Sequence, residues 1–275
     1  MSPPSPRLES RSVTHLEAAF LGLVQGLTEF LPVSSSGHLV LAQHALGLGG
    51  AENLTMDLLL HVATLAAVVI SFRADLLRLA VGIVSDAGQR RLALLLLAAM
   101  IPTGVIALSI RGFITDAFDS PLIVGFLLIT TGALLFFAPR LRKGSGELSE
   151  LRLSNALWIG VAQGVAVLPG ISRSGTTICA GMIGGMTGEA SARFSFLLAI
   201  LAISAAMVLN IPGAASLADA ELSTVGVGML VAFIAGMVSI RWLMRVARQG
   251  RFDGFAYYCW VVGVGAVGIA LWRAG

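Results

Sequence analysis

Two short polar stretches interrupt the apolar runs of this chain and carry most of its reactive side chains. They are EFLPVSSSGH, residues 29–38, and PGISRSGTT, residues 169–177. In the first stretch, Ser35 or Ser36 could act as a nucleophile, with His38 as the general base or acid. This combination indicates attack on an electrophilic centre such as phosphorus.

The second stretch supplies complementary groups for an anion. A guanidinium inside an apolar segment is energetically expensive and is normally paired or functional, and its planar fork matches phosphate oxygens. Arg173 lies among the hydroxyl side chains of Ser172, Ser174, Thr176 and Thr177. With the backbone amides of a turn at a helix start, these groups predict a phosphate cradle. Glu29 of the first stretch could orient His38 or bind a divalent cation that bridges diphosphate oxygens.

The composition predicts that both stretches lie within a membrane. Of the 275 residues, 56% are hydrophobic and only 12% are charged, whereas soluble domains carry about 25% charged residues. The mean hydropathy is +0.89. The net charge of +3 comes from arginines between apolar runs, which favours membrane orientation over nucleic-acid binding. Cys179 and Cys259 both lie in apolar segments and suggest no disulfide framework.

The apolar runs predict an all-α polytopic membrane protein that forms one integral-membrane domain. After a disordered tail, residues 1–14, two interrupted and glycine-rich segments are expected at residues 16–48 and 154–186. We expect transmembrane helices at residues 55–72, 92–110, 121–138, 194–212, 222–242 and 255–272.

The two interrupted segments are related by a shift of 138 residues without gaps. The identical pairs are Gly22 and Gly160, Gln25 and Gln163, Gly26 and Gly164, Ser34 and Ser172, Ser36 and Ser174, and Gly37 and Gly175. The identities favour a duplication into repeat 1, residues 15–140, and repeat 2, residues 154–273. Each repeat is a re-entrant broken-helix hairpin followed by three transmembrane helices. Because three crossings separate the hairpins, the second repeat is expected to be inverted relative to the first.

The charges of the loops predict the orientation. Loops 73–91, 139–153 and 241–253 are rich in Arg or Lys, whereas loops 111–120 and 212–221 carry mostly acidic charges. The positive-inside rule then places both termini outside and opens the first hairpin outward. We therefore expect the active site to be reached from outside the cytoplasmic membrane.

The two polar stretches together resemble the bacitracin-resistance type of undecaprenyl-diphosphate phosphatase, and the likeness extends over essentially the whole chain. The enzyme of that family is an integral protein of the bacterial cytoplasmic (inner) membrane. It removes the terminal phosphate of undecaprenyl diphosphate and so recycles the lipid carrier for peptidoglycan. The resemblance implies that Glu29, Ser35 and His38 are catalytic and that Arg173 binds phosphate.

The remaining site residues are expected to contact the substrate. They are Gln25, Ser34, Ser36, Ser172, Ser174 and Thr177. Many family members have a glutamate where this chain has Gln25, so Glu29 alone would act as metal ligand for Mg²⁺ or Ca²⁺. The expected partners are undecaprenyl diphosphate and the lipid bilayer, with no nucleic acid and with a homodimer as an open alternative.

Other interpretations compete with this one. Inverted repeats with broken helices are also typical of secondary transporters, so a transporter or flippase of an anionic lipid is the alternative function. A phosphatase of the phosphatidic-acid type would need a histidine after Arg173, and the sequence has none. At the level of single residues, Arg173 could simply clamp Glu29. Asp57 and His61, four residues apart on one helix face, suit a packing pair better than a catalytic one.

Overall fold

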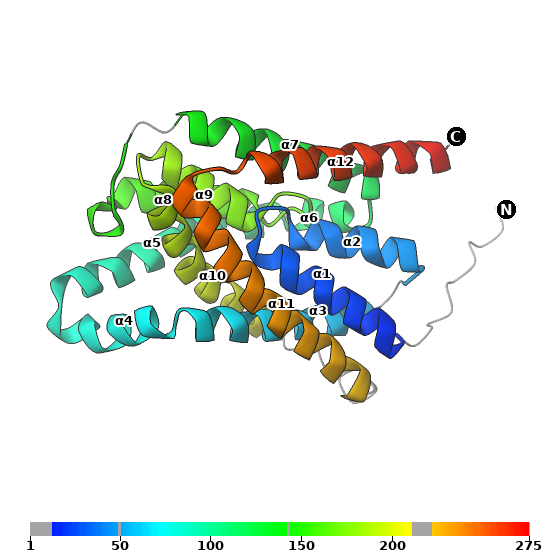
Figure 1. Ribbon diagram of the computed structural model, residues 1–275, viewed down its shortest axis with the longest axis horizontal. Helices are drawn as coiled ribbons and strands as arrows, with labels where there is room; N and C mark the ends of the chain where they lie inside the picture. Colours follow the sequence, from blue (N-terminus) through cyan, green and yellow to red (C-terminus); the bar gives the residue numbers. More distant parts are fainter. Residues whose placement is uncertain (1–12, 49–50, 142–143, 211–221, 275) are drawn as a thin grey trace.

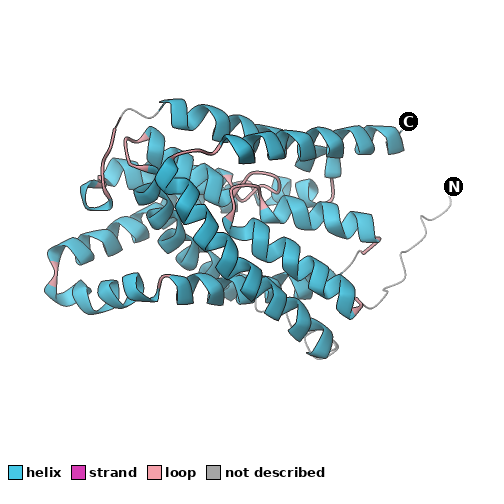
Figure 2. Ribbon diagram, viewed as in Figure 1, coloured by secondary structure: helices cyan, strands magenta, loops and turns pink. Residues whose placement is uncertain are grey.

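The computed structural model describes residues 13–48, 51–141, 144–210 and 222–274, and these residues form an all-helical protein (Figures 1 and 2). In chain order the helices are α1 (His15–Phe30), α2 (Ser35–Leu46), α3 (Ala51–Ser71), α4 (Arg73–Ser85), α5 (Ala87–Ser109), α6 (Arg111–Phe118), α7 (Pro121–Leu141), η1 (Leu148–Glu150), α8 (Leu153–Val165), α9 (Arg173–Ile183), α10 (Gly188–Asn210), α11 (Leu222–Gln249) and α12 (Asp253–Ala274). The predicted all-α class is thus confirmed. Most of the predicted tail and all of loop 212–221 lie outside the described residues.

Five of these helices, α5, α7, α10, α11 and α12, are each long and apolar enough to cross a bilayer. Helices α3 and α4 form a further candidate that bends by 71° between Ser71 and Arg73, so the described residues hold up to six spans. The chain is therefore a multi-pass membrane protein, as its hydropathy predicts. Helices α1, α2, α8 and α9 have only 16, 12, 13 and 11 residues, fewer than the roughly 20 that a crossing needs.

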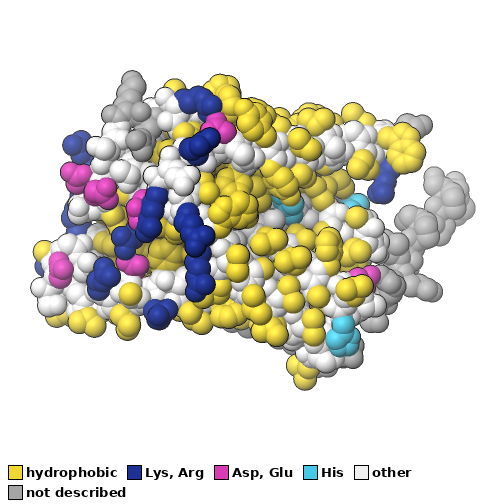
Figure 3. Space-filling model, in the orientation of Figure 1, with side chains coloured by type: hydrophobic (Ala, Val, Ile, Leu, Met, Phe, Trp, Pro, Cys, Tyr) yellow, Lys and Arg dark blue, Asp and Glu magenta, His cyan; other side chains and the backbone are white. Residues whose placement is uncertain are grey.

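The surface fits a lipid environment. Large apolar side chains cover much of the face seen in Figure 3, and Leu16 and Trp272 are each 81% exposed. The described arginine side chains gather toward one end of the molecule, where the connection between α4 and α5 lies. An apolar belt with a basic end is the surface expected of a protein oriented in a bilayer.

Three segments that the sequence predicts as loops are mainly helical. Helix α4 occupies residues 73–85, α6 occupies 111–118, and α11 continues to Gln249. The hydropathy marks only the part of a helix that meets hydrocarbon, whereas backbone hydrogen bonding continues the helix beyond it. Charged residues at these ends can reach the polar interface without ending the helix.

The short helices are held by helices from the other half of the chain. Helix α1 packs mainly on α11 and α8 packs on α5, while α7 pairs with α12. Small residues permit the close approach: a Cβ atom on Gly22 would lie 2.2 Å from the Gly228 carbonyl oxygen. A Cβ atom on Gly160 would lie 2.1 Å from the Ala99 carbonyl oxygen. Such backbone contact is how helices associate where water does not drive them together.

An aromatic cluster lies at the end of α1. The ring of Phe196 is 5.8 Å from the ring of Phe30 and 5.2 Å from that of Phe72, centroid to centroid. All three side chains are at most 5% exposed. The cluster joins α1 to α10 and to the bend after α3, so the residue before Phe30 has a fixed position.

Candidate active site

Each polar stretch forms a tight turn between two short helices. Ser34 caps α2, because its Oγ accepts a hydrogen bond from the Gly37 amide at 3.3 Å. Ser172 caps α9 in the same way, accepting from the Gly175 amide at 3.1 Å. Ser and Thr are favoured at this position because the side chain satisfies an otherwise unpaired amide. Both serines therefore have a structural role besides any contact with substrate.

The two turns are bonded to each other. The Gly170 amide donates to Ser34 Oγ at 3.0 Å, and Ser174 Oγ donates to the Leu31 carbonyl at 3.2 Å. Gly170 has a φ of +104°, and a Cβ atom there would lie 2.6 Å from the Val124 carbonyl of α7. Only glycine satisfies both conditions, so this residue sets how closely the second turn approaches the first.

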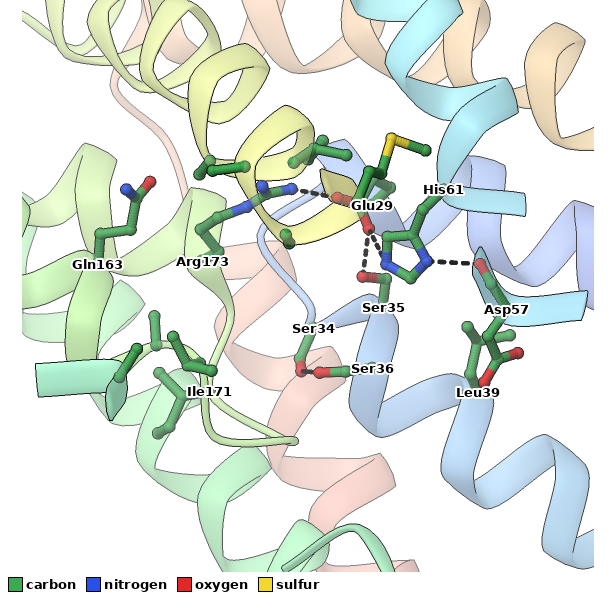
Figure 4. Close-up of a pocket in the computed structure, with 18 of the residues that line it drawn as sticks. Glu29, Ser34, Ser35, Ser36, Leu39, Asp57, His61, Gln163, Ile171 and Arg173 are labelled. Atoms are coloured by element: carbon green, nitrogen blue, oxygen red, sulfur yellow. Dashed lines mark hydrogen bonds and ion pairs between the residues drawn. The ribbon is translucent and has the colours of Figure 1, made fainter. Parts of the chain in front are cut away.

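A cavity of about 500 Å³ lies beside the joined turns (Figure 4). The turns line it with Glu29, Ser34, Ser35, Ser36, Ser172 and Arg173. Helices α5 and α10 line the remainder mainly with apolar side chains, and α3 adds Asp57 and His61. The cavity thus has a polar end at the turns and an apolar extension between helices, which suits a ligand with a polar head and a hydrocarbon tail.

Glu29 is the centre of the polar end. Its side chain is only 2% exposed, and both carboxylate oxygens have partners. Ser35 Oγ donates to Oε2 at 2.5 Å and Gln25 Nε2 donates to the same atom at 3.0 Å. Arg173 Nη2 forms an ion pair with Oε1, and His61 Nε2 lies 3.7 Å from Oε2. The predicted clamp between Arg173 and Glu29 is therefore present in the structure.

This arrangement is suited to attack by a hydroxyl on phosphorus. The carboxylate that accepts the Ser35 proton is placed as a general base. Arg173 commits one Nη2–H to Glu29, and its side chain remains 21% exposed, so other guanidinium hydrogens can reach an anion in the cavity. Ser35 and Arg173 are also the first residues of α2 and α9, where helix dipoles favour negative charge.

The position of His61 and Asp57 was not predicted from the sequence. Both residues line the cavity, and His61 lies between Asp57 and the Glu29–Ser35 pair (Figure 4). Asp57 Oδ1 accepts a hydrogen bond from Gln43 Nε2 of α2 at 2.8 Å. The sequence does show two ionisable residues inside an otherwise apolar span, and such residues often have a function in membrane proteins.

His38 has a different environment from the one expected. Its Nδ1 lies 2.8 Å from the Ser34 carbonyl oxygen and its Nε2 lies 2.9 Å from the Tyr258 hydroxyl. The two rings are stacked, with centroids 5.5 Å apart. His38 does not belong to the cavity lining, so its catalytic role stays a prediction.

Three of the predicted substrate contacts support the turns from behind the cavity surface. Gln25 donates to Glu29 and, at 3.4 Å, to Thr64. Thr177 Oγ1 donates to the Arg173 carbonyl at 2.8 Å. Ser174 Oγ lies 3.2 Å from the capping hydroxyl of the second turn. Ser34, Ser36 and Ser172, by contrast, line the cavity.

The protein side chains do not fit a resident metal ion. Within the described ranges, no group of three or more His, Cys, Asp or Glu side chains is placed to hold one. Both oxygens of Glu29 already face hydrogen-bond donors and a guanidinium. A divalent ion here would need most of its ligands from another molecule, since Mg²⁺ and Ca²⁺ take six or more oxygens.

The fold and the site together define a class: a multi-pass helical membrane protein with a partly polar cavity beside two tight turns between short helices. The particular family follows from comparison with known proteins. The model of the bacitracin resistance protein BacA family matches residues 18–265. The chain therefore belongs to this family, as the two polar stretches predict.

Curated relatives cover nearly the full chain. A protein of Syntrophotalea carbinolica named undecaprenyl-diphosphatase is 44% identical over 255 residues, which is 91% of this chain and 97% of the relative. A protein of the same name from Halothermothrix orenii is 42% identical, covering 89% and 94% of the two chains. A third, from Methanobrevibacter smithii, is 38% identical, covering 90% and 95%.

Proposed function

We propose that this protein hydrolyses undecaprenyl diphosphate to undecaprenyl phosphate and inorganic phosphate. This activity would recycle the lipid carrier for peptidoglycan and confer resistance to bacitracin. The observation that carries the proposal is the set of Ser35, Glu29 and Arg173, which come from two distant turns and converge at one cavity. The names of the curated relatives supply the substrate.

The chemistry is that of a serine nucleophile. Ser35 Oγ attacks the terminal phosphorus while Glu29 Oε2 takes its proton. The bond from that phosphorus to the bridging oxygen breaks, and undecaprenyl phosphate leaves with the electron pair. Water then hydrolyses the phosphoserine, releasing inorganic phosphate and restoring the Ser35 hydroxyl. Arg173 binds the phosphate oxygens on which negative charge accumulates.

His38 would act in this scheme only after its ring leaves Tyr258, since the stacked position is outside the cavity lining. It stands on the first turn of α2, three residues after Ser35. A change of side-chain rotamer is therefore the movement required to bring the imidazole toward the phosphate or the leaving group.

The lipid would lie along the cavity with its diphosphate at the turns. The apolar extension between α5 and α10, which includes Met100, Ile203 and Met207, would receive the first isoprene units. A divalent cation, Mg²⁺ or Ca²⁺, would enter bound to the diphosphate, because the chain alone offers it no cage.

Inverted repeats are supported by the contacts between the turns. A Cβ atom on Gly37 would meet the Gly170 backbone at 3.0 Å, and one on Gly175 would meet Pro32 at 3.2 Å. A shift of 138 residues relates Gly37 to Gly175 and Pro32 to Gly170. The contact of Gly37 with Gly170 and the contact of Gly175 with Pro32 therefore correspond to each other in the two repeats. In Figure 1, α1 and α2 extend toward the right of the view, and α8 and α9 extend toward the left. Two re-entrant hairpins of opposite orientation would produce this arrangement.

An active site open to the outside is supported by the course of the cavity. Its lining reaches Phe118, within the segment 111–120 predicted outside, and Leu209, shortly before the segment 212–221 predicted outside. The basic side chains gather at the opposite end. In Ser36→Cys protein, an impermeant thiol reagent added outside intact cells should modify the new cysteine. The native Cys179 and Cys259 are 0% exposed and give little background. Labelling only from the cytoplasmic side would refute this orientation.

The activity is tested with purified protein in detergent. Wild-type protein with Mg²⁺ or Ca²⁺ should release phosphate from undecaprenyl diphosphate, and Ser35→Ala should lower kcat by about a thousandfold or more. Ser109→Ala, an exposed serine hydroxyl lost from α5, is the matched control and should remain active. Movement of the lipid across liposomes without release of phosphate would instead support a transporter.

A further inference from the structure

A second donor group stands beside Arg173 at the polar end of the cavity. His61 of α3 approaches Glu29 Oε2, while Arg173 of α9 holds Oε1 of the same carboxylate. The side chains of His61 and Arg173 are 32% and 21% exposed, whereas that of Glu29 is 2% exposed. Glu29 lies between the two groups and is the least exposed of the three, so His61 and Arg173 are the more accessible donors for an anion in the cavity (Figure 4).

The orientation of the His61 ring is set within α3. Its Nδ1 lies 2.7 Å from the backbone carbonyl oxygen of Asp57, one helical turn earlier. A carbonyl oxygen only accepts hydrogen bonds, so Nδ1 carries the hydrogen and donates it. This leaves Nε2 as the atom that faces Glu29 and the cavity. Nε2 lies 3.7 Å from the carboxylate, and a hydrogen on Nε2 presents a second N–H donor beside the guanidinium.

The other histidines have different surroundings. All four histidines of the sequence lie in described residues, and His61 is the one that lines the cavity. His15 bonds Ser223, His38 bonds Tyr258, and His44 is exposed on α2. The His61 imidazole is thus the histidine ring that a diphosphate in this cavity would contact without rearrangement.

We propose that His61 is a substrate-binding residue of the reaction, with Nε2–H donating to a non-bridging oxygen of the diphosphate while Arg173 binds the neighbouring oxygens. The proposal rests on the proposed function and deepens it. Glu29 has two roles in this arrangement: it accepts the Ser35 proton, and it holds the His61 and Arg173 donors side by side.

The test compares donors at position 61. His61→Leu removes the donor and should raise the KM for undecaprenyl diphosphate by about tenfold to a hundredfold, the effect of losing one hydrogen bond to a charged group. His61→Gln keeps an N–H donor and should raise KM by about threefold or less. His44→Leu, the same change at the exposed histidine, should leave KM unchanged. A wild-type KM for His61→Leu, or equal losses for His61→Leu and His61→Gln, would overturn the proposal.

A binding measurement separates this proposal from the proposed function. Inorganic pyrophosphate should raise the Tm of detergent-solubilised wild-type protein, and this shift should be retained in His61→Gln and lost in His61→Leu. If wild-type protein releases no phosphate but the pyrophosphate shift depends on His61 in this way, the proposed activity fails and the binding role stands. If phosphate is released while the shift is the same in all variants, the binding role fails alone.

Discussion

The ion pair between Arg173 and Glu29 allows a quantitative prediction about folding as well as activity. Arg173→Ala leaves a carboxylate that is 2% exposed without its cation. Removing one partner of a buried ion pair typically costs about 3–5 kcal/mol. Ser35 and Gln25 still donate to Glu29 Oε2, so we expect a loss of free energy of unfolding near the lower figure, about 3 kcal/mol.

Thermal unfolding in detergent measures this loss. At roughly 2–4 °C per kcal/mol for a domain of this size, Arg173→Ala should lower Tm by about 6–12 °C. The double variant Arg173→Ala/Glu29→Gln removes the unpaired charge and should recover most of that Tm, while both variants release no phosphate. Loss of activity in the stable double variant then reports on chemistry and not on unfolding.

An exposed ion pair supplies the control. Arg248 and Glu189 are 3.0 Å apart with side chains 63% and 36% exposed, so Arg248→Ala should cost less than about 1 kcal/mol and shift Tm by only a few degrees. A wild-type Tm for Arg173→Ala would refute the buried pair. A double variant Arg173→Ala/Glu29→Gln with the same Tm as Arg173→Ala would also refute it.

Three further predictions concern packing, His38 and the cation. Gly22→Ala places a Cβ against the α11 backbone and should cost about 1–3 kcal/mol of stability, whereas Gly226→Ala points into open space and should leave Tm unchanged. Equal changes in Tm for Gly22→Ala and Gly226→Ala would argue against close backbone packing of α1 on α11. Tyr258→Phe removes the hydroxyl that holds His38 outside the cavity, and because such a bond contributes about 1 kcal/mol, kcat should rise by about fivefold if His38 acts after rotating inward. A fall in kcat would show that the stacked position is the active one. EDTA should abolish phosphate release and added Mg²⁺ or Ca²⁺ should restore it without changing the Tm of the lipid-free protein; a lower Tm in EDTA would indicate a resident ion.

The sequence by itself determined the class of protein, the position of the polar turns and the family. These features depend on local patterns: hydropathy marks a span wherever about 20 apolar residues occur, and a polar turn inside such a run is visible without any partner. Arg173 could be identified in the same way, because a guanidinium in an apolar segment requires a partner or an anion. The sequence also offered Glu29 as the partner of Arg173, with a phosphate anion as the other alternative.

Only the tertiary structure decided which ionisable groups share the cavity. His61 belongs to α3 and could have faced lipid or a neighbouring helix; the packing of α1 and α3 on α11 brings it to Glu29. His38 is only three residues from the predicted nucleophile Ser35 in sequence, yet Tyr258, 220 residues away, holds its ring outside the cavity. The physical reason is that a helix presents its side chains in all directions, and the helices packed around it, which come from distant parts of the chain, determine which direction becomes the site.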